Sequence, residues 1–496
     1  MDQLLNAFYV VGHPVPLLLV ALGVLLGVVV GAVPGLGGAM LIALLLPLTF
    51  YMVDLHALIL LVAIYCGSVS GGLITSVMLR MPGTPSSVMT TLDGYPLASQ
   101  GKAGRALSLG IMASTTGGFI SWVFLALLSP ALADVALQFG PYQMFALILM
   151  GLVLIATIAE GAMLKGLLAA CFGMAISLIG PDDSSGAIRY DFNVVELQGG
   201  LSLLPVLLGV FVISQVIHDL LQKTSPIEQQ MLSMRQLVPH VSDLRQHGGN
   251  ATRSSLIGTW VGILPGVGSA IASIVSYTVA KTLSKDPEKF GRGEEAGLVA
   301  AESANNASVN GALIPLITLG IPGSTIDAIL IGALVIHGLQ PGPLLFQNSP
   351  EIAYGIIAGA LIANILMAVI MYLLVRPIAR IASIDKAYLY PSIIVFCVVG
   401  TYAISNNFFD VFVIFVMGAI GFLFRRGGFP IGPLVLGFIL APMAEKELRS
   451  GLMLHDGSLW PLFQSPVSFS FILLTILLSL WPLWRRYKAC FRYGAR

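Results

Sequence analysis

The chain has 496 residues, of which 56% are hydrophobic and only 10% charged, and its mean hydropathy is +0.91. Soluble proteins of this length are far less apolar, so we predict a polytopic membrane protein. The formal net charge of +1 argues against a nucleic-acid-binding face, which would be basic, and four scattered Cys residues without a Cys-x-x-Cys spacing argue against a disulfide framework or a zinc site.

Apolar stretches of about 20 residues, long enough to cross ~30 Å of hydrocarbon, recur along the chain. They cover residues 15–33, 106–129, 142–160, 161–180, 201–217, 352–375, 388–405, 411–424 and 468–484. Residues 39–53 and 254–281 are also apolar, but the first range is short and a Pro-Gly sequence interrupts the second. We therefore expect an all-α polytopic membrane fold with about 10–12 transmembrane segments, some of them broken helices or re-entrant hairpins.

Two Pro-Gly motifs occur twice in the chain. The pattern Gly-x-x-Pro-Gly-x-Gly at residues 31–37 returns at residues 262–268. The pattern Ser-Val-x-Gly-x-Leu-Ile, followed by Pro-Gly, at residues 68–83 returns at residues 308–323. Two halves that each carry helix breaks in corresponding positions are typical of transporters built from internal repeats.

The distribution of Lys and Arg indicates how the copies are oriented, because these residues concentrate in cytoplasmic segments. Four apolar stretches separate the basic residues at 102–105 from the basic segment 218–253, which places the loop after Pro82 inside. One stretch separates the loop after Pro322 from Arg376, which places that loop outside. We therefore predict two inverted-topology repeats and an external N-terminus. The predicted organisation is repeat 1 with its following spans at 1–217, a cytoplasmic linker at 218–253, repeat 2 with its following spans at 254–484 and a cytoplasmic tail at 485–496.

Small polar residues gather at the repeated motifs, where an apolar setting makes them costly without a partner or a ligand. Asn and Ser oxygens suit a hard cation such as Na⁺, and the N–H groups that begin a half-helix suit a carboxylate. The predicted substrate-binding residues are Arg80, Pro82, Gly83, Thr84, Pro322, Gly323, Ser324 and Thr325. The residues predicted to bind the cation or the substrate are Ser68, Ser70, Asn305, Asn306, Ser308 and Asn310. The alternative is that small polar residues only hold closely packed helices together.

Four other features are singled out by their position. Arg80 ends an apolar run and either pairs with the substrate or faces the cytoplasm. The Asp-Gly-Tyr-Pro sequence at 93–96 is predicted to form a turn that ends a broken helix, and His337 to be a satisfied interfacial side chain. Glu302 keeps H⁺ open as the coupling ion in place of Na⁺.

The chain contains no Gly-x-Ser-x-Gly, His-Glu-x-x-His or Walker A motif, so we predict that it is not an enzyme and needs no cofactor or metal beyond a candidate Na⁺. A passive anion channel is the alternative to a transporter, because polar breaks also build selectivity filters. Flux that saturates and requires a cation gradient would favour the transporter.

These motifs resemble those of the large membrane subunit of the tripartite tricarboxylate transporter family, or TctA family, over nearly the whole chain. The most specific matches are Gly71–Ser76, Met81–Pro85, Leu92–Pro96, Glu302–Asn306, Leu319–Gly323 and His337–Pro343.

The resemblance implies a multi-pass protein of the bacterial inner membrane that imports citrate or other small carboxylates on an ion gradient. It further implies two protein partners, a small membrane subunit of about four spans and a periplasmic solute-binding protein, besides membrane lipid and with no nucleic acid. Arg80 departs from the family pattern, which more usually has an uncharged polar residue such as Asn there. This departure predicts an altered substrate preference.

Overall fold

Helices make up nearly all the regular structure of the computed structural model, which describes residues 2–158, 163–182, 185–221, 237, 241–381 and 389–493. Six helical segments in these ranges are long and apolar enough to cross a membrane, and further apolar helices of 10–17 residues accompany them. The six are Pro14–Ala32, Asp54–Met78, Pro85–Ala136, Leu203–Leu221, Pro350–Arg380 and Phe408–Arg426. The prediction of an all-α polytopic membrane protein is confirmed.

The chain forms two units that interleave in the sequence. Unit 1 consists of Met1–Ala133 and Gln215–Ile404, and unit 2 of Asp134–Ser214 and Ser405–Arg496. Both copies of each Pro-Gly motif lie in unit 1. The predicted linker at 218–253 lies partly outside the described residues, and its last part is helical because α11 begins at Val241. The predicted tail lies partly in the last helix, which reaches Tyr493, and partly outside the description.

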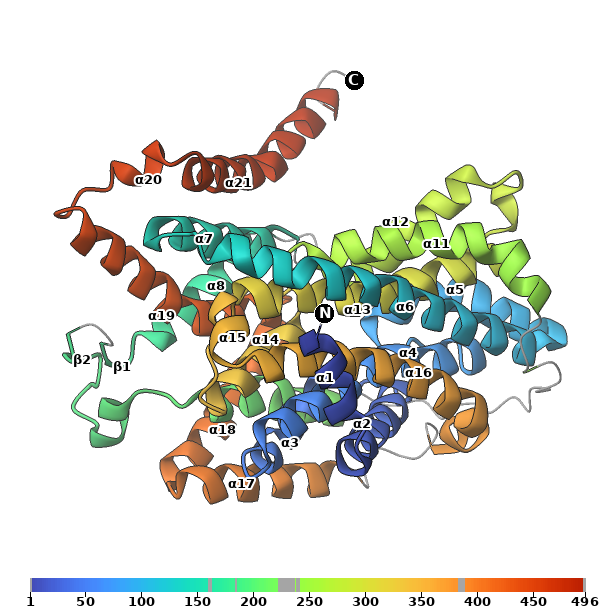
Figure 1. The fold of residues 1–496 in the computed structure, drawn as a ribbon, viewed down its shortest axis with the longest axis horizontal. Coiled ribbons are helices and arrows are strands. Elements are labelled where there is room, and N and C mark those ends of the chain that lie inside the picture. Colours follow the sequence, from blue (N-terminus) through green and yellow to red (C-terminus); the bar gives the residue numbers. More distant parts are fainter. Residues whose placement is uncertain are drawn as a thin grey trace. The chain divides into compact units, whose positions relative to one another are not determined.

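Unit 1 contains the long buried helices and the broken segments. Its elements are α1 (Asp2–Val11), α2 (Pro14–Ala32), α3 (Gly38–Thr49), α4 (Asp54–Met78), η1 (Pro85–Ser87), α5 (Val88–Leu97), η2 (Ala98–Lys102), α6 (Ala103–Ala136), α10 (Ser214–Leu221), α11 (Val241–Ile263), α12 (Gly268–Leu283), η6 (Pro287–Lys289), α13 (Glu295–Leu319), α14 (Thr325–Ile336), α15 (Pro343–Asn348), α16 (Pro350–Ile381) and α17 (Tyr390–Ser405). Helices α2 and α16 pack along α4, whereas α11 and α12 pack along α13 (Figure 1).

The repeated Pro-Gly sequences separate these helices as expected. In the first pair, α2 ends before Pro34 and α3 begins after Gly37, with Gly35 at a φ of 87°. In the second pair, α11 ends before Pro265 and α12 begins at Gly268, with Gly266 at a φ of 74°. Only glycine adopts these positive φ angles without a steric penalty, so the motif dictates the break.

Glycines produce the same close helix contacts in both copies of the motif. A Cβ atom added to these glycines would collide with a carbonyl of the neighbouring helix. The contacts are Gly27 with Ile64 and Gly31 with Ser68 in the first copy, and Gly258 with Ala304 and Gly262 with Ser308 in the second. Corresponding sequence positions therefore make corresponding backbone contacts, while the opposite orientation of the two copies stays a prediction.

Unit 2 contains the remaining elements, with α19 packed on α7 and α8 and α21 packed on α7. They are α7 (Pro141–Ile158), α8 (Met163–Ser177), β1 (Gly180–Pro181), β2 (Ile188–Arg189), η4 (Val195–Gly199), α9 (Leu203–Leu207), η5 (Leu208–Ile213), α18 (Phe408–Arg426), α19 (Ile431–Leu454), α20 (Pro461–Gln464) and α21 (Pro466–Tyr493). The strands β1 and β2 pair antiparallel.

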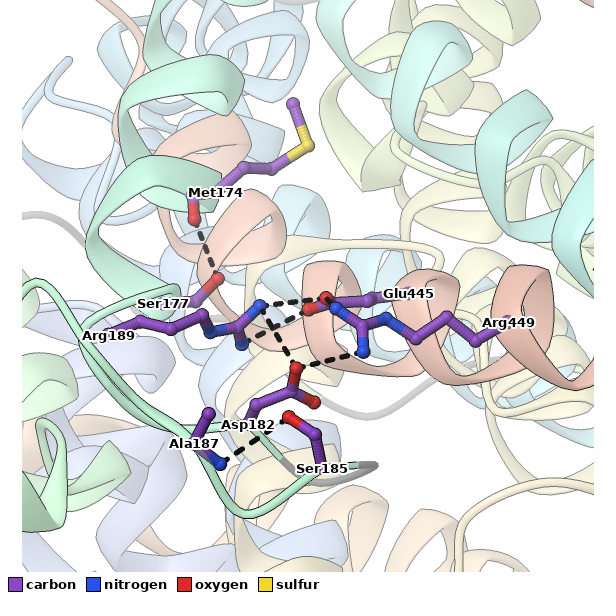
Figure 2. Close-up of polar contacts among 8 residues, drawn as sticks. All are labelled: Met174, Ser177, Asp182, Ser185, Ala187, Arg189, Glu445 and Arg449. Atoms are coloured by element: carbon purple, nitrogen blue, oxygen red, sulfur yellow. Dashed lines mark hydrogen bonds and ion pairs between the residues drawn. The ribbon is translucent and has the colours of Figure 1, made fainter.

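An ion-pair network ties the segment with β1 and β2 to α19 (Figure 2). Arg189 pairs with Glu445 at 2.8 Å, and Arg449 reaches both Asp182, at 2.8 Å, and Glu445, at 2.7 Å. Two Arg and two carboxylates balance in charge, so the network acts as a structural anchor of unit 2.

Candidate functional site

Buried polar side chains meet where α4 and α13 contact each other. The Ser70 hydroxyl lies 2.6 Å from Asn306 Oδ1, and Asn305 Nδ2 donates to the carbonyl of Val69 at 3.4 Å. Ser70, Asn305 and Asn306 are at most 4% exposed. The structure thus brings together residues of both motif copies that the sequence predicted for a single site.

Ser68 and Ser308 occupy corresponding places beside the first break of each copy. Their hydroxyls donate to backbone carbonyls of their own helices, three residues earlier, at 3.0 and 2.7 Å. The Ser68 side chain also lies against Gly38, at the start of α3. Each hydroxyl donates its proton to the helix, and its oxygen keeps the capacity to accept.

Asn310 lies farther along α13 and contacts α6. Its Nδ2 donates to the Gly118 carbonyl at 2.8 Å and to Ser121 Oγ at 3.0 Å. Among the described residues, neither Asn310 Oδ1 nor Asn305 Oδ1 has a hydrogen-bond partner, although both are buried. These two amide oxygens have capacity left for a ligand.

The Pro82-Gly83 break follows α4, and the side chains of the turn that follows it hydrogen-bond to one another. Pro82 is exposed and Gly83 is buried against the carbonyl of Gly31. Thr84 begins the next turn, and its hydroxyl lies 2.9 Å from Ser86 Oγ and 3.3 Å from Ser87 Oγ. This hydroxyl is therefore already engaged within the turn.

The Pro322-Gly323 break follows α13 and leads into α14. Pro322 and Gly323 are buried, whereas Ser324 and Thr325 are partly exposed. Ser324 Oγ accepts a hydrogen bond from the Asp327 N–H at 3.4 Å and lies 3.1 Å from the Tyr65 hydroxyl of α4. The first N–H groups of α14 have no partner within the helix, so they and the positive end of the helix dipole can attract an anion.

Asp327 was not among the residues predicted from the sequence, although it lies in the same first turn of α14 as Thr325. It is completely buried, and neither oxygen of its carboxylate has a hydrogen-bond partner in the described part of the chain. The available signal was the sequence Ser-Thr-Ile-Asp after Pro322-Gly323, which has the spacing of a capping box. In the structure only the Ser half of that box is made.

Two other buried carboxylates are fully engaged. Glu302 accepts hydrogen bonds from Thr90, at 2.5 Å, and Ser114, at 3.0 Å, and so links α13 to α5 and α6. Asp93 accepts from the Tyr277 hydroxyl at 2.8 Å and from three backbone N–H groups of residues 291–294 at 2.8–2.9 Å. The prediction of a turn at residues 93–96 is wrong, because they continue α5, and Asp93 anchors a distant loop.

Arg80 and His337 lie at the ends of the broken helices. The Arg80 side chain is exposed, and its guanidinium lies 5.6 Å from the centre of the Tyr95 ring. His337 Nδ1 lies 2.9 Å from Asp54 Oδ1, and this contact links the end of α14 to the start of α4. A role of Arg80 in substrate binding stays a prediction.

Residues 17–436 match the family described as "Tripartite tricarboxylate transporter TctA family". The chain belongs to this family. The family is one of transporters, and the six long apolar segments of this TctA-family chain agree with a multi-pass membrane protein.

Two similar proteins come from Agrobacterium vitis. One, named "Uncharacterized 52.8 kDa protein in TAR-I ttuC' 3'region", is 37% identical over 95% of this chain and 94% of its own length. The other, "Uncharacterized protein in TAR-II ttuC' 3'region", is 38% identical over 45% of this chain and 94% of its own length. No solved structure matches the chain.

Proposed function

We propose that this chain is the large transmembrane subunit of a binding-protein-dependent secondary transporter that imports tricarboxylates or related small organic carboxylates on a Na⁺ or H⁺ gradient. The observation that carries the proposal is the buried polar contact between α4 and α13, two helices that each end in a Pro-Gly break. Family membership supports the substrate class, and polar broken helices in both copies support a binding site between them.

The substrate carboxylates are bound at the second Pro-Gly break in this proposal. Ser324 and Thr325 are partly exposed there and begin a 12-residue helix whose dipole favours an anion. The first break, Pro82 to Thr84, contributes backbone groups from the other copy. Arg80 adds a positive charge near this break.

In this proposal the coupling cation is bound by side-chain oxygens of α4 and α13. Asn305 Oδ1 and Asn310 Oδ1 are buried acceptors without a partner among the described residues, and Ser68 and Ser308 offer oxygen lone pairs. Hard cations such as Na⁺ prefer oxygen ligands of this kind.

Two protein partners complete the proposed transporter, as the word tripartite implies. A small membrane subunit of about four spans would pack against this chain in the inner membrane, and a periplasmic binding protein would deliver the substrate. Co-purification of the chain with the products of neighbouring genes checks this part, and recovery of this chain alone would contradict it.

Reconstituted vesicles test the transport function. Asn306→Ala should abolish gradient-driven uptake of citrate while leaving the amount of protein in the membrane unchanged. Asn348→Ala, at an exposed position of α15, is the matched control and should transport normally. Full uptake by Asn306→Ala would contradict the assigned site, and unsaturable flux without any gradient requirement would favour the passive channel.

A further inference from the structure

Asp327 stands out among the buried acids of unit 1. A carboxylate removed from water without a partner is strongly unfavourable, and proteins neutralise it with a fixed cation, a proton or a bound ion. Asp327 has 0% exposure, no hydrogen bond to either oxygen and no ion pair among the described residues.

The groups that face Asp327 offer no compensating positive charge. Helix α4 contributes the hydroxyl of Tyr65, which lies 3.1 Å from Ser324 Oγ, and α14 contributes Ser324 itself. Helix α3 reaches the same turn through Gly38, which lies against Ile326, and α13 through Ala312, which lies against Gly323. Among the described residues, α3, α4, α13 and α14 carry no Lys or Arg, and their one His, His56, is at the start of α4, nine residues before Tyr65. The neutralising group therefore has to be a proton or an ion that binds.

Other buried carboxylates of unit 1 have hydrogen-bond partners, so burial alone does not leave a carboxylate unpaired. Glu302 accepts two hydrogen bonds and Asp93 accepts four, so both carboxylates are tied into the fold. Within the described part of the chain no hydrogen bond reaches the Asp327 carboxylate, yet the Ser324 hydroxyl lies in the same turn and the Tyr65 hydroxyl lies 3.1 Å from Ser324 Oγ. A carboxylate surrounded by hydroxyl oxygens has the ligand chemistry of a site for a hard monovalent cation or a proton.

We propose that Asp327, with the hydroxyls of Tyr65 and Ser324, binds a second coupling cation, Na⁺ or H⁺, besides the one assigned to the oxygens of Asn305, Asn310, Ser68 and Ser308. This inference rests on the proposed function and adds Asp327 to the candidate site. The location gives a physical reason for coupling. Asp327 occupies the first turn of α14, where the substrate carboxylate is proposed to bind, so its negative charge opposes the substrate until a cation neutralises it. Cation binding therefore precedes and strengthens substrate binding, and each ligand raises the affinity for the other.

Uptake of labelled citrate by vesicles that contain the complete transporter tests this. One arm applies an inward Na⁺ gradient at equal pH, and the other an inward H⁺ gradient without Na⁺; the arm that drives wild-type uptake identifies the cation. Asp327→Asn removes the charge permanently. This variant should lower gradient-driven accumulation of citrate at least tenfold. It should leave the rate of citrate counterflow unchanged, because without the negative charge substrate binding no longer needs the cation. Asp54→Asn, the same change at the other end of the α4–α14 pair, should keep the wild-type gradient dependence.

Two milder variants keep the inference testable if Asp327→Asn does not fold. Tyr65→Phe and Ser324→Ala each remove one hydroxyl, and each should raise the half-saturating cation concentration about threefold to tenfold with a smaller change in maximal rate. The inference is overturned if Asp327→Asn retains full gradient-driven accumulation, or if both milder variants keep the wild-type half-saturation. If wild-type protein accumulates no carboxylate under either gradient, the proposed function itself fails, which is a different result.

Discussion

Arg80 and Gly320 adopt the same left-handed backbone conformation, with φ angles of 56° and 69°, at the ends of α4 and α13. They are also corresponding positions of the repeated motif. Gly takes this conformation freely and Asn tolerates it, whereas other residues pay a steric penalty. Gly or Asn in place of Arg80 would therefore relieve the backbone, besides any effect on substrate preference.

Substitutions of Arg80 separate the backbone from the charge. Arg80→Gly should raise the free energy of unfolding by roughly 1 kcal/mol, because it relieves the left-handed strain, offset in part by the lost contact with Tyr95. Arg80→Ala keeps the strain and removes the charge. Thermal unfolding in detergent checks stability, and competition by a panel of carboxylates checks specificity. An unchanged substrate profile in both variants would remove Arg80 from the substrate site.

Asp93 should be one of the most sensitive positions of unit 1. Asp93→Ala leaves three backbone N–H groups of residues 291–294 without their acceptor, and each unpaired group costs about 1–3 kcal/mol. We expect a loss of more than ~3 kcal/mol in the free energy of unfolding and faster proteolysis of the loop between α12 and α13. Asp286→Ala is the control, because its pair with Lys289 is exposed and should change stability by less than ~0.5 kcal/mol. Equal effects of the two substitutions would contradict the anchoring role.

Acid should weaken the attachment of α11 to α13. Glu295, the first residue of α13 and outside the six candidate spans, bonds to His247 and Arg105, and these contacts lower its pKa from 4.5 to about 2. A lowered pKa in the folded state means that the ionised form stabilises the fold above pH 4.5 and that this contribution is lost as the pH falls from 4.5 to 2. The melting temperature of wild type should therefore fall across this range more than that of Glu295→Gln. Glu288→Gln, at an exposed site, should behave like wild type; an identical pH profile for Glu295→Gln would contradict this account.

The orientation of the two copies can be measured directly. Lys102→Cys, at the end of η2, and Gln347→Cys, in α15, place single exposed thiols in the segments that follow the Pro82-Gly83 and Pro322-Gly323 breaks, in a background without the native Cys residues. An impermeant thiol reagent added outside intact cells should label Cys at 347 and spare Cys at 102, because the charge distribution predicts opposite sides. Labelling of both from the same side would remove the inverted-repeat hypothesis.

The helical class and the breaks were predictable from the sequence because each rests on local physics. Apolar length determines which segments can span a membrane, and Gly at positions such as Gly35 and Gly266 permits a backbone conformation that ends a helix. The partners of buried polar groups were not predictable, since they depend on tertiary contacts. Asp93 illustrates this: its sequence is that of a turn, but its carboxylate binds a loop about 200 residues away.

In the candidate site, too, features of the local sequence were predictable and tertiary contacts were not. Asn305 and Asn306 were predicted because three Asn residues in apolar sequence are unusual, and their contacts with α4 bring both motif copies together. Asp327 was missed because an acid in the first turn of a helix is common and compatible with the helix dipole. Its significance comes from burial without a partner, which only the three-dimensional structure reveals.

Paired glycine substitutions test whether the two Pro-Gly breaks have the same packing. Gly83 lies against the carbonyl of Gly31, and Gly323 lies 2.8 Å from the carbonyl of Gly262, measured from an added Cβ. Gly83→Ala and Gly323→Ala should each lower the free energy of unfolding by about 1–3 kcal/mol, because the added methyl group forces the break away from the preceding one. Gly248→Ala, in α11 with nothing near the added methyl group, should be neutral or stabilising by up to about 1 kcal/mol. Thermal unfolding and citrate uptake would be measured for all three. A loss of stability for only one of Gly83→Ala and Gly323→Ala would show that the two breaks are packed differently. The repeated sequence would then encode two different sites.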